Sequence, residues 1–261
     1  MIESLHSPHI ARVKALTGSK GASERREMGL FVAEGIQCAR EALSSSSGPQ
    51  IKSIYATHAG LAKIEELDIS SVDVIEVSEG VMKAMADTVT PQGILTLCYK
   101  PETLLSDVTP EGKPLLVYLH QIQDPGNAGT VLRSADAMGV TAVITSPESV
   151  DMYSPKVVRA TAGSLWNIPV VEGVSLSEVI QAFPAVSPLL LSSHAAVSLT
   201  DIKVPHGAIA IFGNEARGVS ASELGSPVTE VTIPMSGRAE SLNLSAAAAI
   251  TIFTLSAKVA G

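Results

Sequence analysis

Short apolar runs alternate with helical patterns through the first hundred residues of the chain. Apolar residues between His9 and Leu16 recur at helical spacing, whereas the small, polar and charged residues 19–29 predict an exposed loop. The further predicted elements are strands at residues 30–35, 51–56, 72–77 and 94–99 and helices at 36–43, 61–67 and 79–86. This alternation predicts a compact α/β domain over residues 1–100.

A second α/β domain is predicted over residues 114–261. Residues 101–113 separate the two domains, and their polar composition with Pro101, Pro110 and Gly112 is typical of a linker. Residues 115–119 are apolar at nearly every position, as in a parallel strand that is buried on both faces. The remaining predicted elements are strands at 140–144, 170–171, 189–191, 208–212 and 228–233 and helices at 127–138, 154–160 and 176–183. The pattern predicts an open parallel sheet covered by helices on both sides.

The run from Ser241 to Ala257 carries no charge. It is rich in Ala, Ser and Thr rather than Leu, and Asn243 lies inside it, so a buried or dimer-facing helix is predicted instead of a membrane span. The N-terminus has no basic region followed by an apolar core, which is the pattern of a signal peptide. We therefore expect a cytoplasmic protein without a membrane segment.

Composition narrows the function further. The chain has 261 residues, 46% of them hydrophobic, and a formal net charge of −8. That charge argues against attraction of the whole molecule to nucleic acid. Local basic residues lie at 12–26, where the alternatives are a solvated helix face and a binding patch. Cys38 and Cys98 lie apart in apolar runs, so neither a disulfide framework nor a metal site is expected.

Three loops follow strands and precede helices, and each is rich in small and polar residues. Their sequences are Asp124-Pro125-Gly126-Asn127-Ala128-Gly129, Gly213-Asn214-Glu215-Ala216-Arg217-Gly218, and Pro234-Met235-Ser236-Gly237 continuing to Glu240-Ser241-Leu242-Asn243. Ligands of open parallel sheets bind beyond the carboxyl ends of strands. The sequence thus predicts that the three loops form one site.

The first loop matches neither a dinucleotide fingerprint nor a phosphate-binding loop, because it lacks the spaced glycines and the Gly-Lys-Ser/Thr ending. Asn127 and Arg133 are nearly two helical turns apart, which predicts that both side chains face the site. The alternatives are a helix cap for Asn127 and a surface ion pair with Asp136 for Arg133. Glu215 is expected to accept a hydrogen bond from a ribose or to orient its neighbours, unless it only favours a helix N-terminus.

Taken together, the three loops resemble the signature motifs of SpoU-type (TrmH-like) RNA 2′-O-ribose methyltransferases in the SPOUT superfamily. The resembling segments are Asn127–Gly129 with Arg133–Gly139, Ile211–Gly218, and Ile233–Gly237 with Glu240–Ser245. Residues 151–165 are also similar to that family. The first domain resembles the L30e-like substrate-binding domain that is common there.

The resemblance implies a parallel sheet with a C-terminal trefoil knot and a homodimer with each active site near the interface. S-adenosylmethionine would bind in the knot, held around Leu191, Gly213, Ile233 and Leu242. Arg133 would act on the ribose 2′-hydroxyl, with Asn127, Glu215, Ser241 and Asn243 orienting it and the ribose. Because a guanidinium is a poor base at its usual pKa, we expect Arg133 to polarise the attacking oxygen and hold a phosphate.

The predicted function is S-adenosylmethionine-dependent 2′-O-methylation of RNA, with 23S rRNA preferred to tRNA because of the separate N-terminal domain. Arg133, Lys156, Arg159, Arg217 and the basic residues at 12–26 are expected to meet the RNA. Two alternatives remain from the sequence. One is an RNA-binding protein that uses the same fold without catalysis, and the other is a nucleotide-dependent α/β enzyme of another type. The complete polar set disfavours the former, and the missing glycine fingerprint disfavours the latter.

Overall fold

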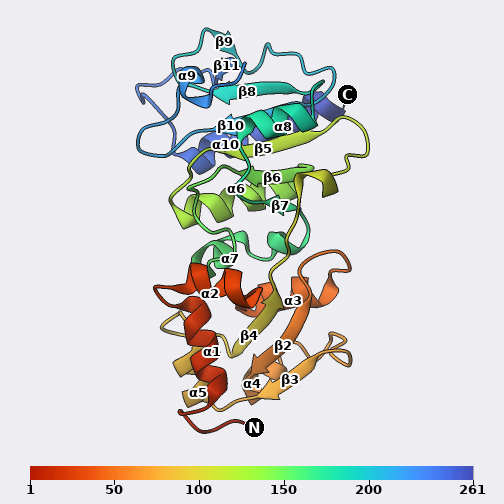
Figure 1. Cartoon of the computed structure of the whole chain (residues 1–261), viewed down its shortest axis with the longest axis vertical. Coiled ribbons are helices and arrows are strands. Elements are labelled where there is room, and N and C mark those ends of the chain that lie inside the picture. Colours follow the sequence, from red (N-terminus) through yellow and green to blue (C-terminus); the bar gives the residue numbers. More distant parts are fainter. Residues whose placement is uncertain (261) are drawn as a thin grey trace. The chain divides into compact units, whose positions relative to one another are not determined.

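Two compact units make up the chain, and the computed structural model describes residues 1–260 of it (Figure 1). The first unit contains Met1–Pro101 together with Asp151–Asn167, and the second contains Glu102–Val150 together with residues 168–260. The two-domain organisation predicted from the sequence counted residues 151–167 with the C-terminal domain. In the structure this segment packs within the first unit.

A mixed four-stranded sheet in the order β1-β4-β2-β3 forms the centre of the first unit. Only the β2–β3 pair is parallel. Its elements are α1 (Pro8–Thr17), α2 (Gly21–Met28), β1 (Leu30–Glu34), α3 (Ile36–Ser44), β2 (Ile51–Ala56), α4 (His58–Leu61), β3 (Asp73–Glu76), α5 (Glu79–Met85), β4 (Ile94–Tyr99), α7 (Pro155–Thr161) and η2 (Ser164–Trp166).

Both faces of this sheet are buried. Leu95 and Leu97 of β4 pack with Val13, Leu16 and residues of α5 on one face. Ile54 and Ala56 of β2 pack with Ala39 of α3 on the other. The alternation along each strand is that of a sheet between two helical layers. Cys38 and Cys98 are free and buried, so both are core residues. Burial raises the pKa of the Cys38 thiol to about 11.

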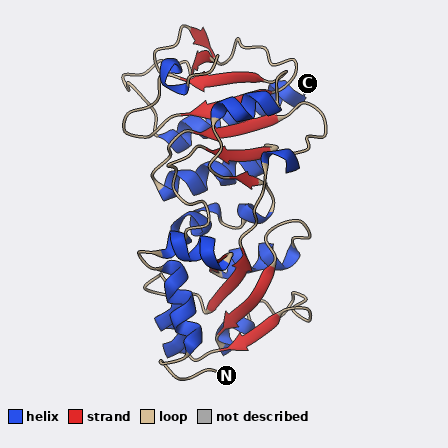
Figure 2. Cartoon of the chain, viewed as in Figure 1, coloured by secondary structure: helices blue, strands red, loops and turns tan. Residues whose placement is uncertain are grey.

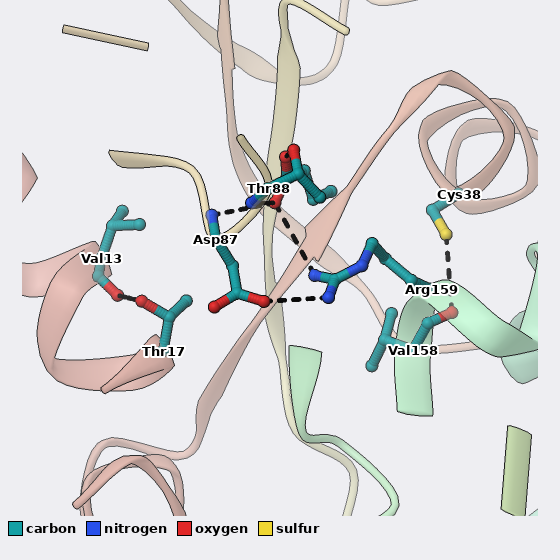
Figure 3. Close-up of polar contacts among 8 residues, drawn as sticks. Val13, Thr17, Cys38, Asp87, Thr88, Val158 and Arg159 are labelled. Carbon is teal, nitrogen blue, oxygen red and sulfur yellow. Dashed lines mark hydrogen bonds and ion pairs between the residues drawn. The ribbon is translucent and has the colours of Figure 1, made fainter. Parts of the chain in front are cut away.

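Ion pairs attach residues 151–167 to the rest of the first unit. The buried Arg25 donates to Asp151, with Nη2 at 2.8 Å from a carboxylate oxygen. Arg159 of α7 lies 2.9 Å from Asp87 and 3.8 Å from Glu34 (Figure 3). The side chain of Glu34 is buried and accepts from the backbone N–H groups of Asp87 and Thr88 at 3.0 and 3.3 Å. The Thr88 hydroxyl donates to the other oxygen, Oε1, so the buried carboxylate is tolerated because each of its oxygens has a partner.

The second unit is a seven-stranded parallel sheet in the order β7-β6-β5-β10-β8-β11-β9. In Figure 2 its strands are red, with helices on both sides. Its elements are η1 (Leu105–Asp107), β5 (Leu115–Leu119), α6 (Pro125–Ala137), β6 (Ala142–Thr145), β7 (Val170–Val171), α8 (Leu176–Ala182), β8 (Ser187–Leu191), β9 (Val197–Ser198), β10 (Ala208–Phe212), α9 (Ala221–Leu224), β11 (Thr229–Thr232) and α10 (Leu244–Ala260).

The central strands of this sheet are buried on both faces, as the continuous apolar runs predicted. Tyr118 and Ile211 pack against Leu176 and Val179 of α8 on one face. Helices α6 and α10 contact each other, and α10 lies on β5 and β10 at the opposite face. The predicted α/β class is thus confirmed, with a mixed sheet in the first unit and a parallel sheet in the second.

Two local predictions were wrong, and two short elements were missed. The loop predicted at 19–29 contains helix α2 (Gly21–Met28), and the buried ion pair of Arg25 with Asp151, 126 positions away, stabilises this helix. The helix predicted at 61–67 is a single turn, His58–Leu61. The short elements β9 and α9 were not predicted. A run of four residues or fewer carries too little periodicity to be recognised.

None of the helices in the described part of the chain has the length and apolar character needed to cross a membrane. The expectation of a cytoplasmic protein stays a prediction.

Candidate functional site

The loops after β5, β8, β10 and β11 meet at one edge of the second sheet. All four strands are parallel neighbours, so their carboxyl ends lie together. This position is where ligands bind to open α/β sheets, and the structure therefore brings the three predicted loops to one place.

Asn127 stands at the centre of a polar cluster in this edge. It lies in the first turn of α6, which is capped by the Asp124 side chain accepting from Asn127 N at 2.7 Å. Asn127 Oδ1 accepts from Ser245 Oγ at 2.8 Å and from Asn243 Nδ2 at 3.4 Å. Its Nδ2 lies 3.5 Å from Glu215 Oε1. The predicted tight loop at Asn127 is therefore a helix start, and Asp124 rather than Asn127 is its cap.

Glu215 joins the loop after β10 to the loop after β5. Its Oε1 accepts from the backbone N–H of Asp124 at 3.0 Å, and its Oε2 from that of Gln123 at 3.2 Å. With each oxygen on a different N–H group, the carboxylate holds the entry to α6 in place. Glu215 also lies beside the Asn127 amide, and the orienting role that the sequence analysis gave it stays a prediction.

Asn243 is the N-cap of α10, which directly follows it. Asn243 Oδ1 accepts from Ser245 N at 2.9 Å and from Ala246 N at 3.4 Å at the start of α10. Asn243 therefore binds two helices at once, because its oxygen caps α10 while its amide nitrogen reaches Asn127 of α6. Ser241 is exposed and lines the cavity described next.

A cavity of about 620 Å³ opens beside this cluster. All four residues predicted to bind the cofactor line it, namely Leu191, Gly213, Ile233 and Leu242. Glu215 and Ser241 of the predicted catalytic set line it as well. Its size lies within the range of pockets for cofactors and small ligands.

Gly213 allows the loop after β10 to fold back on itself. A Cβ at this position would lie 2.6 Å from Val219 N and 2.7 Å from Gly218 C, both backbone atoms. The loop closes through Gly218 N donating to Asn214 O at 2.8 Å. Only glycine fits such an approach, so Gly213 shapes the cavity wall by the space it leaves.

Carboxylates outnumber cations among the charged residues of the cavity lining. Glu215, Glu223 and Glu230 line it, against Arg217. Hydrogen bonds from the Ser220 backbone and hydroxyl lower the pKa of Glu223, which keeps it charged. Such a lining favours a ligand with a positively charged group.

Arg133 does not line the cavity and is exposed. Six residues advance a helix by about one and two-thirds turns, so the two side chains project about 120° apart around α6. That Asn127 and Arg133 face one site stays a prediction. No residue within 1–260 forms a hydrogen bond or ion pair with Arg133, so its guanidinium is open to a partner molecule.

The basic residues predicted to meet RNA in the first unit differ in their surroundings. Arg12, Lys14, Lys20 and Arg26 are exposed, and we call them the basic face of α1 and α2. Arg25 and Arg159 are instead engaged by carboxylates within the first unit. The expectation that Arg25 meets RNA was wrong, since its guanidinium is buried against Asp151. A role of the partly exposed Arg159 in RNA binding stays a prediction.

Several cavity residues escaped the sequence prediction. They are Ser192, Ser193, His194, Glu223, Glu230, Thr232 and Met235. His194 follows a predicted strand end, and this position was the available signal. Glu230 and Thr232 belong to β11 itself, where only the spatial order of the strands reveals their neighbours.

Comparisons with known proteins agree with the geometry. Residues 114–253 match the SpoU rRNA Methylase family, and residues 8–96 match the MRM3-like substrate binding domain. The chain belongs to the SpoU rRNA methylase family. It is thus a member of a family of RNA 2′-O-ribose methyltransferases, as the three motifs predicted.

Individual relatives are similar along the whole chain. A 23S rRNA (guanosine(2553)-2′-O)-methyltransferase of Bacillus subtilis is 31% identical over 97% of this chain and 98% of its own. An AdoMet-bound rRNA methyltransferase from Sinorhizobium meliloti is 28% identical, with a TM-score of 0.83 over 97% and 96% of the two chains. A solved RNA 2′-O ribose methyltransferase is 30% identical, with a TM-score of 0.79 over 98% of both chains.

Proposed function

We propose that this chain transfers a methyl group from S-adenosylmethionine to a ribose 2′-hydroxyl of RNA. The observation that carries the proposal is the polar cluster of Asn127, Glu215, Asn243 and Ser245 beside the cavity, with the exposed Arg133 on the same helix as Asn127. The cluster fixes the starts of α6 and α10 and so provides the rigid support that aligned group transfer needs.

The cavity residues suit S-adenosylmethionine. When bound, this cofactor supplies a methyl group on a positively charged sulfur. The lining combines the apolar Leu191, Ile233 and Leu242 with the carboxylates of Glu215, Glu223 and Glu230. Apolar side chains provide surface for an adenine, and carboxylates favour the sulfonium charge over a neutral ligand. Leu191, Gly213, Ile233 and Leu242 would hold the cofactor.

Arg133 would bind the RNA phosphate and polarise the attacking ribose oxygen. A guanidinium holds its proton at neutral pH, so it acts by charge and hydrogen bonding rather than as a base. Asn127 and Asn243 would hold α6 in register with α10, Glu215 would fix the entry to α6, and Ser241 would contact the ribose from the cavity side. The N-terminal unit would bind the RNA.

Methyl transfer by purified protein tests this function. We expect label from methyl-labelled S-adenosylmethionine to appear at 2′-hydroxyls of 23S rRNA in total RNA from cells that lack the gene. Arg133→Ala should lower transfer by about 10²–10³-fold while the Kd for the cofactor stays within about twofold. Arg40→Ala is the matched control, since Arg40 forms a surface ion pair with Glu66 in the first unit. Label in tRNA alone would show that tRNA is the substrate. Binding of RNA without any methyl transfer would show an RNA-binding protein without catalysis.

We also infer a homodimer through α10. Ile250 and Phe253 of this helix are 42% and 62% exposed, although the opposite side of the helix is in the core. Large exposed apolar side chains on one helix face are typical of a contact surface. Sedimentation equilibrium should give a dimer for the wild type and a monomer for Phe253→Glu. A monomeric wild type at micromolar concentration would contradict the dimer.

A trefoil knot in the second unit remains part of the proposal. Its support is that α10 follows β11 yet packs on β5 and α6, which begin the unit. The chain has therefore crossed back from β11 past β8 to β10 and β5. Pulling the chain by its termini should leave a shortened contour length if a knot tightens, and full extension of all residues would argue against it.

A further inference from the structure

Two residues with left-handed backbone conformations face each other at the carboxyl ends of β5 and β6. Gln121 has φ 50° and Glu148 has φ 65°. Neither is glycine, so each conformation is unfavourable and persists only because the surroundings hold it. Gln121 Nε2 donates to Glu148 Oε2 at 3.1 Å, which joins the two strained positions directly.

The backbone of Gln121 is fixed from both sides. Its N–H donates to the buried Ser146 Oγ at 2.7 Å. Its carbonyl accepts from Asn214 Nδ2 at 2.9 Å, in the loop after β10. Gln121 thus connects the ends of three neighbouring strands, β6, β5 and β10.

The side chain of Gln121 reaches the same loop a second time. Gln121 Oε1 accepts from Arg217 Nη2, while Nε2 of the same amide donates to Glu148. An amide can offer an acceptor to a guanidinium and a donor to a carboxylate at once. Arg217 and Asn214 both line the cavity.

We propose that Gln121 and Glu148 form a positioning pair that holds the Asn214–Gly218 wall of the cavity for S-adenosylmethionine. Asn214 Oδ1 accepts from Ala216 N at 3.0 Å and Arg217 N at 3.3 Å, so its side chain shapes the loop that carries Arg217. Gln121 fixes both ends of this loop segment, and Glu148 fixes the rotamer of Gln121. Neither residue touches the cavity itself, so the pair acts through Asn214 and Arg217. This inference rests on the proposed function, because the ligand it names is the cofactor proposed above.

An exchange of the two functional groups tests the pair. In Gln121→Glu the donor to Glu148 is lost and two carboxylates face each other, so the Kd for S-adenosylmethionine should rise about threefold. In the double variant Gln121→Glu/Glu148→Gln the amide and the carboxylate trade places, with both hydrogen bonds and the net charge kept. Its Kd should return to within about twofold of the wild type.

The variant Gln121→Gly tests the contribution of the side chain separately from that of the strained backbone. Glycine adopts positive φ without cost, so this variant keeps the conformation and removes both side-chain hydrogen bonds. Its Kd should rise about tenfold, and the KM for cofactor should rise while kcat at saturating cofactor stays within about twofold. Gln181→Glu, an exposed position of α8, makes the same chemical change as Gln121→Glu and should leave the Kd unchanged.

Calorimetry of each full-length variant, with its melting temperature measured beside it, decides between the outcomes. A weakened Gln121→Glu that the second substitution restores supports the positioning pair. If Gln121→Gly and Gln121→Glu both bind S-adenosylmethionine with the wild-type Kd, the positioning pair is overturned and the proposed function is not. A double variant as weak as Gln121→Glu also overturns it, because the exchange keeps every contact that the pair makes. A wild type that binds no S-adenosylmethionine overturns both this inference and the proposed function.

Discussion

Glu34 in the first unit and Glu215 in the second perform the same local task with different geometry. Each carboxylate accepts hydrogen bonds from the backbone N–H groups of two consecutive residues, Asp87 and Thr88 for Glu34 and Gln123 and Asp124 for Glu215. Glu34 receives both N–H groups on a single oxygen and is 7% exposed, whereas Glu215 receives one on each oxygen and borders the cavity. One carboxylate completes a core, and the other supports a site.

The comparison teaches that a carboxylate on backbone amides is not by itself a functional signal. Glu34 also attracts Arg159, which ties α7 to β1. Glu215 is adjacent to Asn127, through which α6 meets α10. Function follows from what lies next to each network, a packed helix in one case and an open cavity in the other.

The largest effect is expected at Glu34. Glu34→Ala should lower the free energy of unfolding by about 3 kcal/mol, because two backbone N–H groups and the Thr88 hydroxyl lose their acceptor and Arg159 loses an ion-pair partner. Glu34→Gln should cost only about 1 kcal/mol, since one amide oxygen can still accept both N–H groups. Urea unfolding measures both variants. A Kd for the cofactor that rises strongly in Glu34→Gln would contradict its purely structural role.

Glu215 should respond in the opposite pattern. Its two oxygens serve different N–H groups, so an amide places its NH2 against one of them whichever way it turns. Glu215→Gln and Glu215→Ala should therefore lose similar stability, about 1–2 kcal/mol each, and methyl transfer should fall about tenfold in both. A Gln variant with full activity would show that the carboxylate does not hold the α6 entry.

A smaller effect is expected at Asn243, which separates capping from contact with Asn127. Asn243→Ala should destabilise the protein by about 1 kcal/mol through loss of the α10 cap. Asn243→Asp keeps the capping oxygen and removes the donor to Asn127. Thermal unfolding of the aspartate variant should match the wild type while its transfer rate falls. If Asn243→Asp and the wild type transfer methyl groups at equal rates, Asn243 acts only as the cap of α10.

The smallest effect on stability is expected at the basic face of α1 and α2. Changing its four residues Arg12, Lys14, Lys20 and Arg26 to Gln should leave unfolding unchanged and reduce the slope of log K for RNA against log salt by about 0.7 per lost phosphate contact. Arg25→Gln alone should destabilise the first unit, because Asp151 then loses its partner. Fluorescence titration with RNA at several salt concentrations measures the slope. If the fourfold variant keeps the wild-type slope of log K against log salt, RNA does not bind to the basic face of α1 and α2.

Several strands and the residues that line the cavity could be predicted from the sequence. The strands at Ile51–Ala56, Leu115–Leu119 and Ala208–Phe212 were predicted with the bounds that the structure has, because short segments rich in β-branched, aromatic and other apolar residues between turn residues favour strands over helices. Leu191, Gly213, Ile233 and Leu242 were chosen by resemblance and line one cavity. Their roles in binding and catalysis stay predictions.

Orientation and pairing were not readable. The sequence placed Arg133 in one site with Asn127, whereas the structure leaves Arg133 exposed and outside the cavity lining. It counted Arg25 and Arg159 among the contacts for RNA because charge alone does not reveal a partner more than 70 positions away. The positive φ values of Gln121 and Glu148 have no signal in residues that are not glycine.

The sequence by itself determined the α/β class, the parallel sheet of the second unit and the family, because these depend on periodicity and on motifs that occupy contiguous residues. Only the tertiary structure decided which charges are neutralised, which side chain caps α10, and how Gln121 meets Arg217 across 96 positions. The physical reason is that hydrogen bonds and ion pairs act over a few ångströms, and the chain brings their partners to that distance only after the strands have aligned.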